Sequence, residues 1–302
     1  METFRYRSLN AALREQFGEK VYKLALDGGF TCPTRDGTLD TRGCIFCGGG
    51  SGAFAEPVGT DVHAAIERAK ERVADKGGKK YIAYYHSYTG TYAPIARLRQ
   101  LYTETLIHPD IVALSIGTRP DCLPDEVVSL LRELNHVKPV WVELGLQTIH
   151  EATAKYIRRE YPLRVFNDAV ARLHVAGITV IVHMILGLPG ETPEMMVETA
   201  RYIGISGADG IKFQLLHVLA GTDLVEDYRK GQFSVMTLKE YIRVLETCVE
   251  VIPADMVIHR LTGDGAKREL LAPLWSADKK HVLNAINQAF EQDDVRQGRH
   301  IL

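Results

Sequence analysis

Three cysteines lie in one glycine-rich loop at a spacing suited to a metal centre. Cys32, Cys44 and Cys47 fall within sixteen residues, with eleven and then two residues between them. Four thiolates would complete a structural zinc site or an ordinary iron–sulfur cluster, whereas three leave one metal position for a ligand that is not protein. We therefore expect chemistry at an open metal position.

The same triad is also compatible with zinc, because Cys₃His sites are common and a Cys-x₂-Cys pair suits either metal. His86, His183 and His217 are candidates for the fourth zinc ligand. The long first spacing and the glycine run at 48–50 have no role in a closed structural site, and they favour the open centre. A non-catalytic, zinc-stabilised scaffold is the alternative of another class.

Polar side chains recur on one face of four apolar segments, each of which has the pattern of a strand. If helices cover the outside of a barrel, polar residues at every second strand position must point inward. An apolar core does not tolerate several such groups without partners, so we expect this interior to be the active site. For any one of them alone, a satisfied core hydrogen bond explains the residue equally well. The inward set contains Ser115, Arg119, Glu143, Gln147, His183, Lys212 and Gln214.

Strand-like and helix-like segments alternate along the chain, which is typical of βα units and a parallel sheet. Six or more such units can close into a barrel, stop at an open partial barrel or form a doubly wound sheet. We expect strands near 21–27, 81–87, 111–118, 140–147, 178–186, 210–217 and 256–261. We expect helices near 61–76, 94–107, 124–135, 163–176, 193–205, 237–251 and 278–291, with Asp121, Thr192 and Thr237 as caps.

Composition favours one domain of an ordinary cytoplasmic protein. The 302 residues are 46% hydrophobic and 25% charged, and the sequence contains no apolar run long enough for a membrane span. Five cysteines, three of them in one loop, argue against a disulfide framework and for a reducing compartment. A net charge of −2 provides no global signature of nucleic-acid binding.

The cysteine loop resembles the cluster-binding segment of radical S-adenosylmethionine (SAM) enzymes, and the spacing resembles their YhcC/YtqA-like subfamily. The usual superfamily spacing is three residues and then two, so the CX₁₁CX₂C pattern departs from it. The resemblance covers nearly the whole chain in order. It includes 30–52, SIGTRPD at 115–121, ELGLQT at 143–148, HMILGLPGE at 183–191, LLHV at 215–218, LTGD at 261–264 and APLWS at 272–276.

The resemblance implies an α/β fold, a partial (βα)6 TIM-like radical-SAM barrel with a C-terminal extension. We expect one radical-SAM domain over 1–302. Within it, 1–20 would be an N-terminal extension, 21–225 the barrel core and 226–302 a C-terminal strand and helical extension.

The resemblance also implies the cofactors, a [4Fe-4S] cluster and SAM, and the residues that hold them. Cys32, Cys44 and Cys47 would bind three irons, and the methionine amino and carboxylate groups of SAM would chelate the fourth. Arg158 or Arg159 resembles the arginine that pairs with the methionine carboxylate. The predicted SAM-binding set is Phe46, Gly48, Gly49, Gly50, Ser115, Thr118, Glu143, Gln147, Arg158 and Leu216.

The activity implied by the resemblance is radical chemistry on tRNA. An electron delivered to the cluster would cleave SAM, and the 5′-deoxyadenosyl radical would take a hydrogen atom from the substrate. Family members look like maturation enzymes for the wobble uridine that convert carboxymethylaminomethyluridine to aminomethyluridine, and the core resembles the catalytic subunit of Elongator. The alternative substrate is a small metabolite or a peptide.

The catalytic candidates are Lys212, His183 and His217, because an imidazole or an amine in a closed pocket suits acid–base work. The expected partners are tRNA, an electron donor such as flavodoxin or ferredoxin, and a possible downstream methyltransferase.

Overall fold

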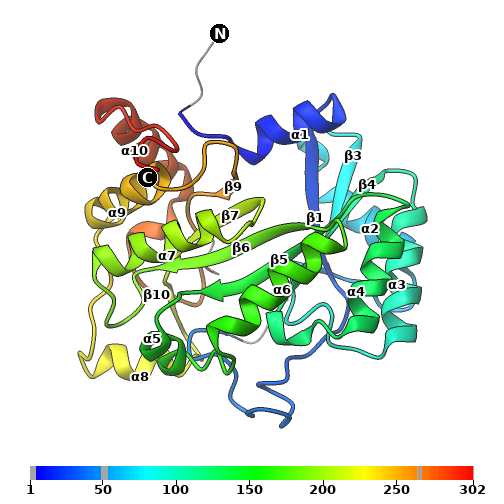
Figure 1. The fold of residues 1–302 in the computed structure, drawn as a ribbon, viewed down its shortest axis with the longest axis horizontal. Coiled ribbons are helices and arrows are strands. Elements are labelled where there is room, and N and C mark those ends of the chain that lie inside the picture. Colours follow the sequence, from blue (N-terminus) through cyan, green and yellow to red (C-terminus); the bar gives the residue numbers. More distant parts are fainter. Residues whose placement is uncertain (1–4, 49–53, 264, 266, 302) are drawn as a thin grey trace.

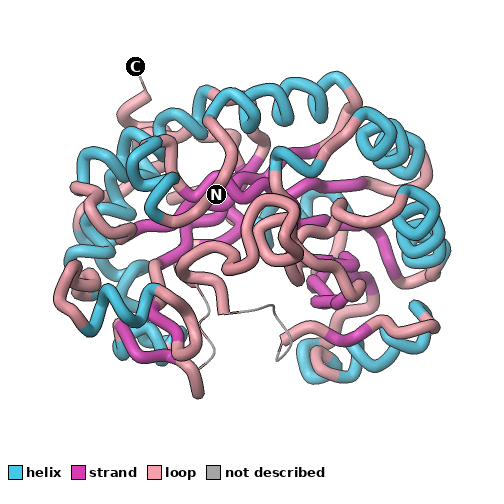
Figure 2. The backbone as a smooth tube through the Cα atoms, turned by 90° about the horizontal axis from the view of Figure 1, so that it is seen from below, coloured by secondary structure: helices cyan, strands magenta, loops and turns pink. Residues whose placement is uncertain are grey.

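Parallel strands form one curled sheet at the centre of the chain (Figures 1 and 2). The computed structural model describes residues 5–48, 54–263, 265 and 267–301. Within these residues the sheet has eight strands in the order β2-β1-β3-β4-β5-β6-β7-β9, and every neighbouring pair is parallel. The strands are β1 (Val21–Asp27), β2 (Glu56–Pro57), β3 (Lys80–Tyr85), β4 (Ile111–Thr118), β5 (Val140–Gln147), β6 (Thr179–Leu186), β7 (Gly210–Leu215) and β9 (Val257–Arg260).

Helices surround the sheet on its outer side (Figure 2), as expected for right-handed βα units. The sequence prediction placed seven strands and seven of these helices within a few residues of their positions in the structure. The helices are α1 (Leu9–Phe17), α2 (Val62–Glu71), α3 (Ile95–Ile107), α4 (Asp125–Asn135), α5 (Glu151–Tyr156), α6 (Leu163–Val175), α7 (Pro193–Ile205), α8 (Leu224–Arg229), α9 (Leu238–Glu250) and α10 (Lys279–Gln292).

Two of the three predicted helix caps are present in the structure and explain where their helices begin. The third predicted cap is absent. Thr192 accepts a hydrogen bond from the backbone of α7, and Thr237 forms a reciprocal capping box with Glu240 at the start of α9. The prediction that Asp121 caps the helix near 124 is wrong. Asp121 lies in a short 3-10 turn, and both of its carboxylate oxygens accept hydrogen bonds from Arg119.

The amino-terminal segment closes the end of the barrel at which the strands begin, at the top of Figure 1. The sequence prediction treated 1–20 only as an extension. In the structure α1 lies against β1 and β9, and the backbone N–H of Ile258 donates to the carbonyl of Arg7 over 2.8 Å. Leu13 packs into a small apolar cluster with Trp141 and Ile181 on the strands above it. This segment is the floor of the barrel.

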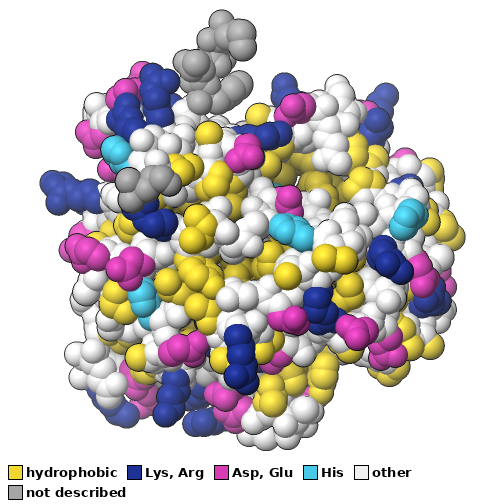
Figure 3. Space-filling model, viewed as in Figure 1, with side chains coloured by type: hydrophobic (Ala, Val, Ile, Leu, Met, Phe, Trp, Pro, Cys, Tyr) yellow, Lys and Arg dark blue, Asp and Glu magenta, His cyan; other side chains and the backbone are white. Residues whose placement is uncertain are grey.

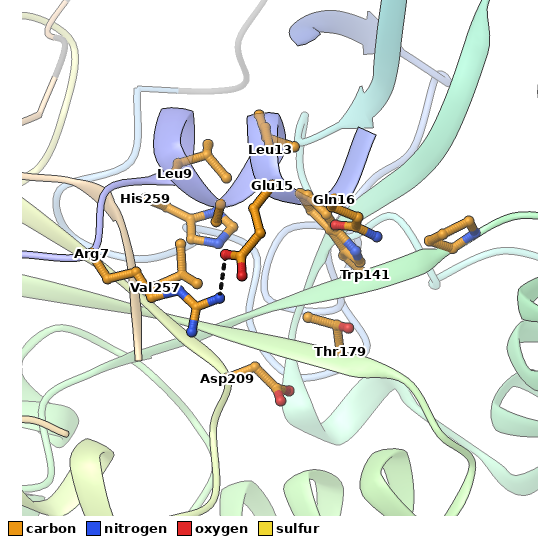
Figure 4. A pocket seen from close by; sticks show the side chains of 12 residues that line it. Arg7, Leu9, Leu13, Glu15, Gln16, Trp141, Thr179, Asp209, Val257 and His259 are labelled. Atoms are coloured by element: carbon orange, nitrogen blue, oxygen red, sulfur yellow. Dashed lines mark hydrogen bonds and ion pairs between the residues drawn. The ribbon is translucent and has the colours of Figure 1, made fainter. Parts of the chain in front are cut away.

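A cavity of about 390 Å³ remains between this floor and the strand ends (Figure 4). Trp141 and His259 line its inner side, and their rings meet edge to face with centroids 5.7 Å apart. Arg7 and Glu15 form an ion pair of 3.0 Å at its outer side. The cavity therefore lies at the amino-terminal ends of the strands, whereas the cysteine loop lies at their carboxyl ends.

The carboxyl ends of the strands carry the irregular part of the chain. The cysteine loop, α5, α8 and a short antiparallel pair, β8 (Val218–Leu219) with β10 (Leu270–Ala272), gather there. A separate hydrophobic cluster forms around Ile45, Leu188 and Leu216, with Phe46 packed against it. This part of the chain covers the mouth of the barrel. The predicted domain boundary at 225 stays a prediction.

Candidate functional site

Glu143 is the centre of a buried polar cluster inside the barrel. Its side chain has no exposed surface, and both carboxylate oxygens accept hydrogen bonds. Oε1 accepts from Lys23 over 2.6 Å and from Ser115 over 2.7 Å. Oε2 accepts from the hydroxyl of Tyr84 over 2.8 Å, from His183 Nε2 over 2.7 Å and from the Lys212 ammonium. We call these six residues the Glu143 cluster.

The strand register brings these side chains together. Glu143 is paired with Gly117 on one side and with Ile181 on the other. His183 is paired with Lys212. Because side chains alternate between the two faces of a strand, one polar residue at the inward position of each strand places all of them in one interior. The prediction that four strands contribute polar groups to a common interior is confirmed for Ser115, Glu143, His183 and Lys212.

Burial and mutual proximity set the charge states of the Glu143 cluster. Burial alone would raise the pKa of Glu143, but the ammonium groups of Lys212 and Lys23 outweigh it and hold that pKa well below the usual range. The pKa of Lys212 is lowered to about 7, chiefly by burial, with Glu143 opposing the shift and with Lys23 and Arg260 adding to it. Burial and the charge of Lys212 lower the pKa of His183 to about 4. At neutral pH the carboxylate is ionised and His183 is neutral.

The tautomer of His183 follows from its two partners. Nε2 must carry the proton, since its partner is the ionised carboxylate of Glu143. Nδ1 then accepts from the side-chain amide of Gln214 over 3.2 Å. Both ring nitrogens are engaged, so Lys212 is the member of the predicted catalytic set best placed to gain or lose a proton near neutral pH.

The three loop cysteines face one another at the mouth of the barrel. The thiol of Cys32 lies 2.9 Å from the hydroxyl of Thr89, and that of Cys44 lies 3.8 Å from the carbonyl of Arg158. Burial and the neighbouring thiol of Cys47 raise the pKa of Cys44 to about 12. All three are free thiols within electrostatic reach of one another.

The three thiols bear on the choice between the two metal centres considered above. Among the described residues the three sulfur atoms are not all within 4.8 Å of one another. Two sulfurs on one tetrahedral zinc ion lie about 3.8 Å apart, for Zn–S bonds of about 2.3 Å. Cys32, Cys44 and Cys47 are therefore not gathered around a single zinc ion. Three thiols are the donor set that an iron–sulfur cluster with one open position requires. Ligation by these residues stays a prediction.

Several of the predicted SAM-binding residues lie above the Glu143 cluster. Phe46 and Leu216 belong to the hydrophobic cluster at the mouth. Gly48 faces Thr222 and Glu269, since a Cβ there would lie within 4 Å of both side chains. Thr118 is buried, and its hydroxyl lies 2.5 Å from that of Thr91. Gly49 and Gly50 lie outside the described residues.

Gln147 and Arg158 lie at the rim. Gln147 is the last residue of β5, has a left-handed backbone with φ of 69°, and carries a buried side-chain oxygen without a hydrogen-bond partner. Strain and an orphaned acceptor at one residue are typical of a ligand site. Arg158 is paired with Asp223 over 2.5 Å. Arg159 is buried instead, and its guanidinium donates to the carbonyls of Thr148 and Tyr161.

His217 follows the carboxyl end of β7 (Gly210–Leu215). Its ring packs against Gly263 and Gly265, so closely that a Cβ on Gly263 would lie 2.9 Å from it. The structure therefore separates the three predicted catalytic residues into a pair in the interior and one near the mouth. All three roles stay predictions.

Sequence reasoning missed two residues that the structure places at the site. Lys23 occupies an inward position of β1 and contacts Glu143 directly, and the alternation within VYKLALD was a signal that pointed to it. Thr89 contacts the thiol of Cys32 from a loop whose position nothing in the local sequence indicates. Tyr84 of β3 also donates its hydroxyl hydrogen to Glu143.

Within the described part of the chain, none of the helices has both the length and the apolar character needed to cross a bilayer.

Known proteins resemble this chain in sequence over its full length. The sequence model of the Radical SAM superfamily matches residues 41–203, and that of the Radical_SAM C-terminal domain matches residues 208–292. The uncharacterised protein YtqA of Bacillus subtilis is 45% identical over 297 residues, which cover 98% of this chain and 92% of YtqA.

Two further proteins are similar over a part of their own length. A tRNA uridine(34) acetyltransferase of Methanocaldococcus infernus is 28% identical over 168 residues, which cover 55% of this chain and 31% of that enzyme. The solved structure of archaeal Methanocaldococcus infernus Elp3 with an N-terminal deletion matches with a TM-score of 0.72 and 19% identity, over 92% of this chain and 64% of that one. This structural match supports the partial-barrel fold.

Proposed function

The chain belongs to the radical SAM superfamily and to its YtqA-like group, and on this premise we propose that it modifies the wobble uridine of tRNA. The reaction would convert 5-carboxymethylaminomethyluridine to 5-aminomethyluridine by removal of the carboxymethyl group. The proposal of a tRNA substrate is supported by the similarity of this chain to an enzyme named for its action on tRNA uridine 34.

The superfamily uses a [4Fe-4S] cluster and SAM, which together supply a 5′-deoxyadenosyl radical that takes a hydrogen atom from the substrate. This membership replaces the alternative of a zinc-stabilised scaffold. We propose that Cys32, Cys44 and Cys47 hold the cluster, because they are three free thiols within electrostatic reach of one another. Gln147 would bind SAM through its unpartnered side-chain oxygen, and Phe46 and Leu216 would contact its apolar parts.

The chain's own contribution to the reaction lies below this cofactor site. The Glu143 cluster presents Lys212, whose pKa of about 7 lets its amine hold or release a proton at Nζ in neutral solution. His183 is held in one neutral tautomer by Glu143 and Gln214, so it orients groups rather than exchanging protons. The hydrophobic side chains at the mouth would limit the access of water to this interior.

The test compares wobble nucleosides in cells with and without the gene by mass spectrometry. Loss of the gene should raise carboxymethylaminomethyluridine and lower its aminomethyl products. Cells carrying Cys44→Ala should resemble the deletion, while cells carrying Cys248→Ala, a matched change of a buried cysteine in α9, should resemble the wild type. Unchanged carboxymethylaminomethyluridine in the deletion would remove tRNA as the substrate.

A small metabolite or a peptide is the second candidate substrate, and the charge of the chain favours it. The net charge is −2, and acidic and basic side chains are interspersed on the face shown in Figure 3. Binding to tRNA through phosphates should weaken steeply with salt. Absence of any salt-dependent tRNA affinity, together with SAM cleavage to 5′-deoxyadenosine, would favour this candidate. The reductant would be a flavodoxin or ferredoxin, and a methyltransferase acting on the amine would follow under the tRNA hypothesis.

A further inference from the structure

The hydroxyl of Thr89 is buried directly beside the sulfur of Cys32. The two atoms lie 2.9 Å apart, and Thr89 has no exposed surface. A buried hydroxyl requires a hydrogen-bond partner, and in the described part of the chain the structure gives it this sulfur. In the free thiol either atom can donate. A thiolate bound to iron carries no hydrogen, so in that state the hydroxyl of Thr89 must be the donor.

Backbone contacts hold this hydroxyl in place. The N–H of Thr89 donates to the carbonyl of Thr31 over 3.2 Å, next to Cys32 in the chain. The N–H of the following residue, Gly90, donates to the carbonyl of Gly117 in β4 over 2.9 Å. A Cβ on Gly90 would lie 2.7 Å from the side chain of Ile116, so the Thr89 loop packs tightly on β4. The fold itself therefore positions the hydroxyl toward Cys32.

Arg35 supplies a positive charge to the same cysteine loop. Its guanidinium donates to the carbonyl of Cys47 over 2.6 Å, and it lies within electrostatic reach of the sulfurs of Cys47 and Cys32. Gly43 leaves room for this group, because a Cβ there would lie 2.6 Å from Nε and 2.7 Å from Cζ of Arg35. The cysteine loop thus contains a cation of its own beside the thiols.

A hydrogen-bond donor and a cation at these places would act on a bound cluster through its sulfur ligands. Reduction by one electron adds negative charge to an iron–sulfur cluster and its thiolates. The reduction potential of such a cluster depends on hydrogen bonds to the sulfurs, on the net charge nearby and on exposure to solvent. Both kinds of group stabilise the more negative, reduced form by the larger amount, so both raise the potential.

We propose that Thr89 and Arg35 are positioning residues that raise the reduction potential of the cluster held by Cys32, Cys44 and Cys47. This inference rests on the ligation by the three cysteines in the proposed function, but not on the identity of the substrate. A raised potential would make it easier for a flavodoxin or ferredoxin to supply the electron.

The experiment is a redox titration of the anaerobically reconstituted full-length protein without SAM, followed by electron paramagnetic resonance of the reduced cluster. Thr89→Val removes the hydroxyl and keeps the shape of the side chain. At a fixed applied potential the ratio of reduced to oxidised cluster should fall about threefold to tenfold, a decrease of about 30–60 mV for one electron. Thr89→Ser keeps the hydroxyl and should restore most of the ratio.

Arg35 is tested in the same titration. Arg35→Leu should lower the ratio about threefold to tenfold, and Arg35→Lys, which keeps the charge, should lower it less. Because Arg35 is only partly buried, high salt should reduce its effect more than that of the buried Thr89. Thr199→Val removes another buried hydroxyl, one that donates within α7, and should leave the potential unchanged.

An unchanged potential in Thr89→Val with a full complement of iron and sulfide would overturn the role of Thr89, and the same result in Arg35→Leu would overturn that of Arg35. Loss of the cluster from either variant would show a role in assembly and would overturn its role in the potential as well. These outcomes are distinct from failure of the proposed function. A wild type that binds no cluster would reject the ligation itself, whereas unchanged tRNA nucleosides together with shifted potentials would reject only the substrate.

Discussion

The Glu143 cluster and the cysteine loop are both sites of chemistry, but they are built differently. The Glu143 cluster is carried by neighbouring strands, and its central carboxylate has every contact satisfied by the protein. The cysteine loop is irregular, and its three cysteines are free thiols. The polar groups of the first site are satisfied within the protein, whereas under the proposed function the second site would bind a metal cluster.

This difference predicts how substitutions at each site should affect stability and metal binding. Damage to the strand-borne cluster leaves buried charges without partners and should reduce stability. Damage to the loop should remove the metal group and leave the sheet intact.

The largest effect is expected from Cys44→Ala. Loss of one of three thiolates should abolish binding of iron and sulfide and hence production of 5′-deoxyadenosine, while the circular dichroism spectrum stays that of a folded α/β protein. Iron and sulfide analysis after anaerobic reconstitution provides the measurement, and Cys248→Ala is the control. A variant that retains a full cluster would show that Cys44 is not a ligand.

Glu143→Gln should destabilise the fold by about 3–5 kcal/mol, because Lys23 and Lys212 lose their counter-charge in a buried site. Urea unfolding of the cofactor-free protein would measure this free energy. The exposed Glu71→Gln should lie within about 0.5 kcal/mol of the wild type. A similarly small effect at Glu143 would mean that the cluster does not hold the strands together.

Lys212 should make stability depend on pH. Its pKa of about 7 in the folded protein lies below the value of about 10.4 for a free lysine. Between these values the unfolded chain binds a proton that the folded chain has released, so the free energy of unfolding should increase with pH. The slope contributed by this residue is at most about 1.4 kcal/mol per pH unit. Urea unfolding between about pH 7 and about pH 9 should show this slope in the wild type and its loss in Lys212→Met.

The smallest change in stability is expected at the rim. Gln147→Gly removes an unpartnered buried oxygen and relieves a left-handed backbone, so the free energy of unfolding should change by less than about 1 kcal/mol. The affinity for SAM should nevertheless fall about tenfold, as measured by equilibrium dialysis. Glu160→Gly, at another residue with positive φ, should leave SAM binding unchanged. An unaltered affinity in Gln147→Gly would remove this residue from the cofactor site.

Much of the fold could be predicted because its signals are local. Apolar runs marked the main strands, and their alternation identified Ser115, Glu143, His183 and Lys212 as inward residues that the structure brings together. The same alternation in β1 pointed to Lys23, but a lysine in a strand is easily interpreted as a surface residue. The thiol triad was evident from residue type and spacing alone.

Other features depend on contacts between distant segments, which no local pattern encodes. The amphipathic segment 9–17 could be a surface helix in any fold, and only its packing on β1 and β9 makes it the floor. The packing of Gly263 and Gly265 on the ring of His217 joins the end of β7 to residues that follow β9. The pairing of Arg158 with Asp223 joins residues 65 positions apart.

The amino-terminal floor has a consequence for the order in which the chain assembles during synthesis. The N–H of Arg7 donates to the side chain of Gln297, Arg5 forms an ion pair with Asp294, and β9 follows the seven other strands of its sheet in the sequence. When the ribosome has synthesised the cysteine loop and most of the strands, the nascent chain still lacks the residues that hold α1 against the barrel. The base of the barrel thus stays unsealed until β9 and Gln297 have been synthesised, and a ribosome-bound chain that lacks them should exchange the amides of 9–17 far faster than the released protein does.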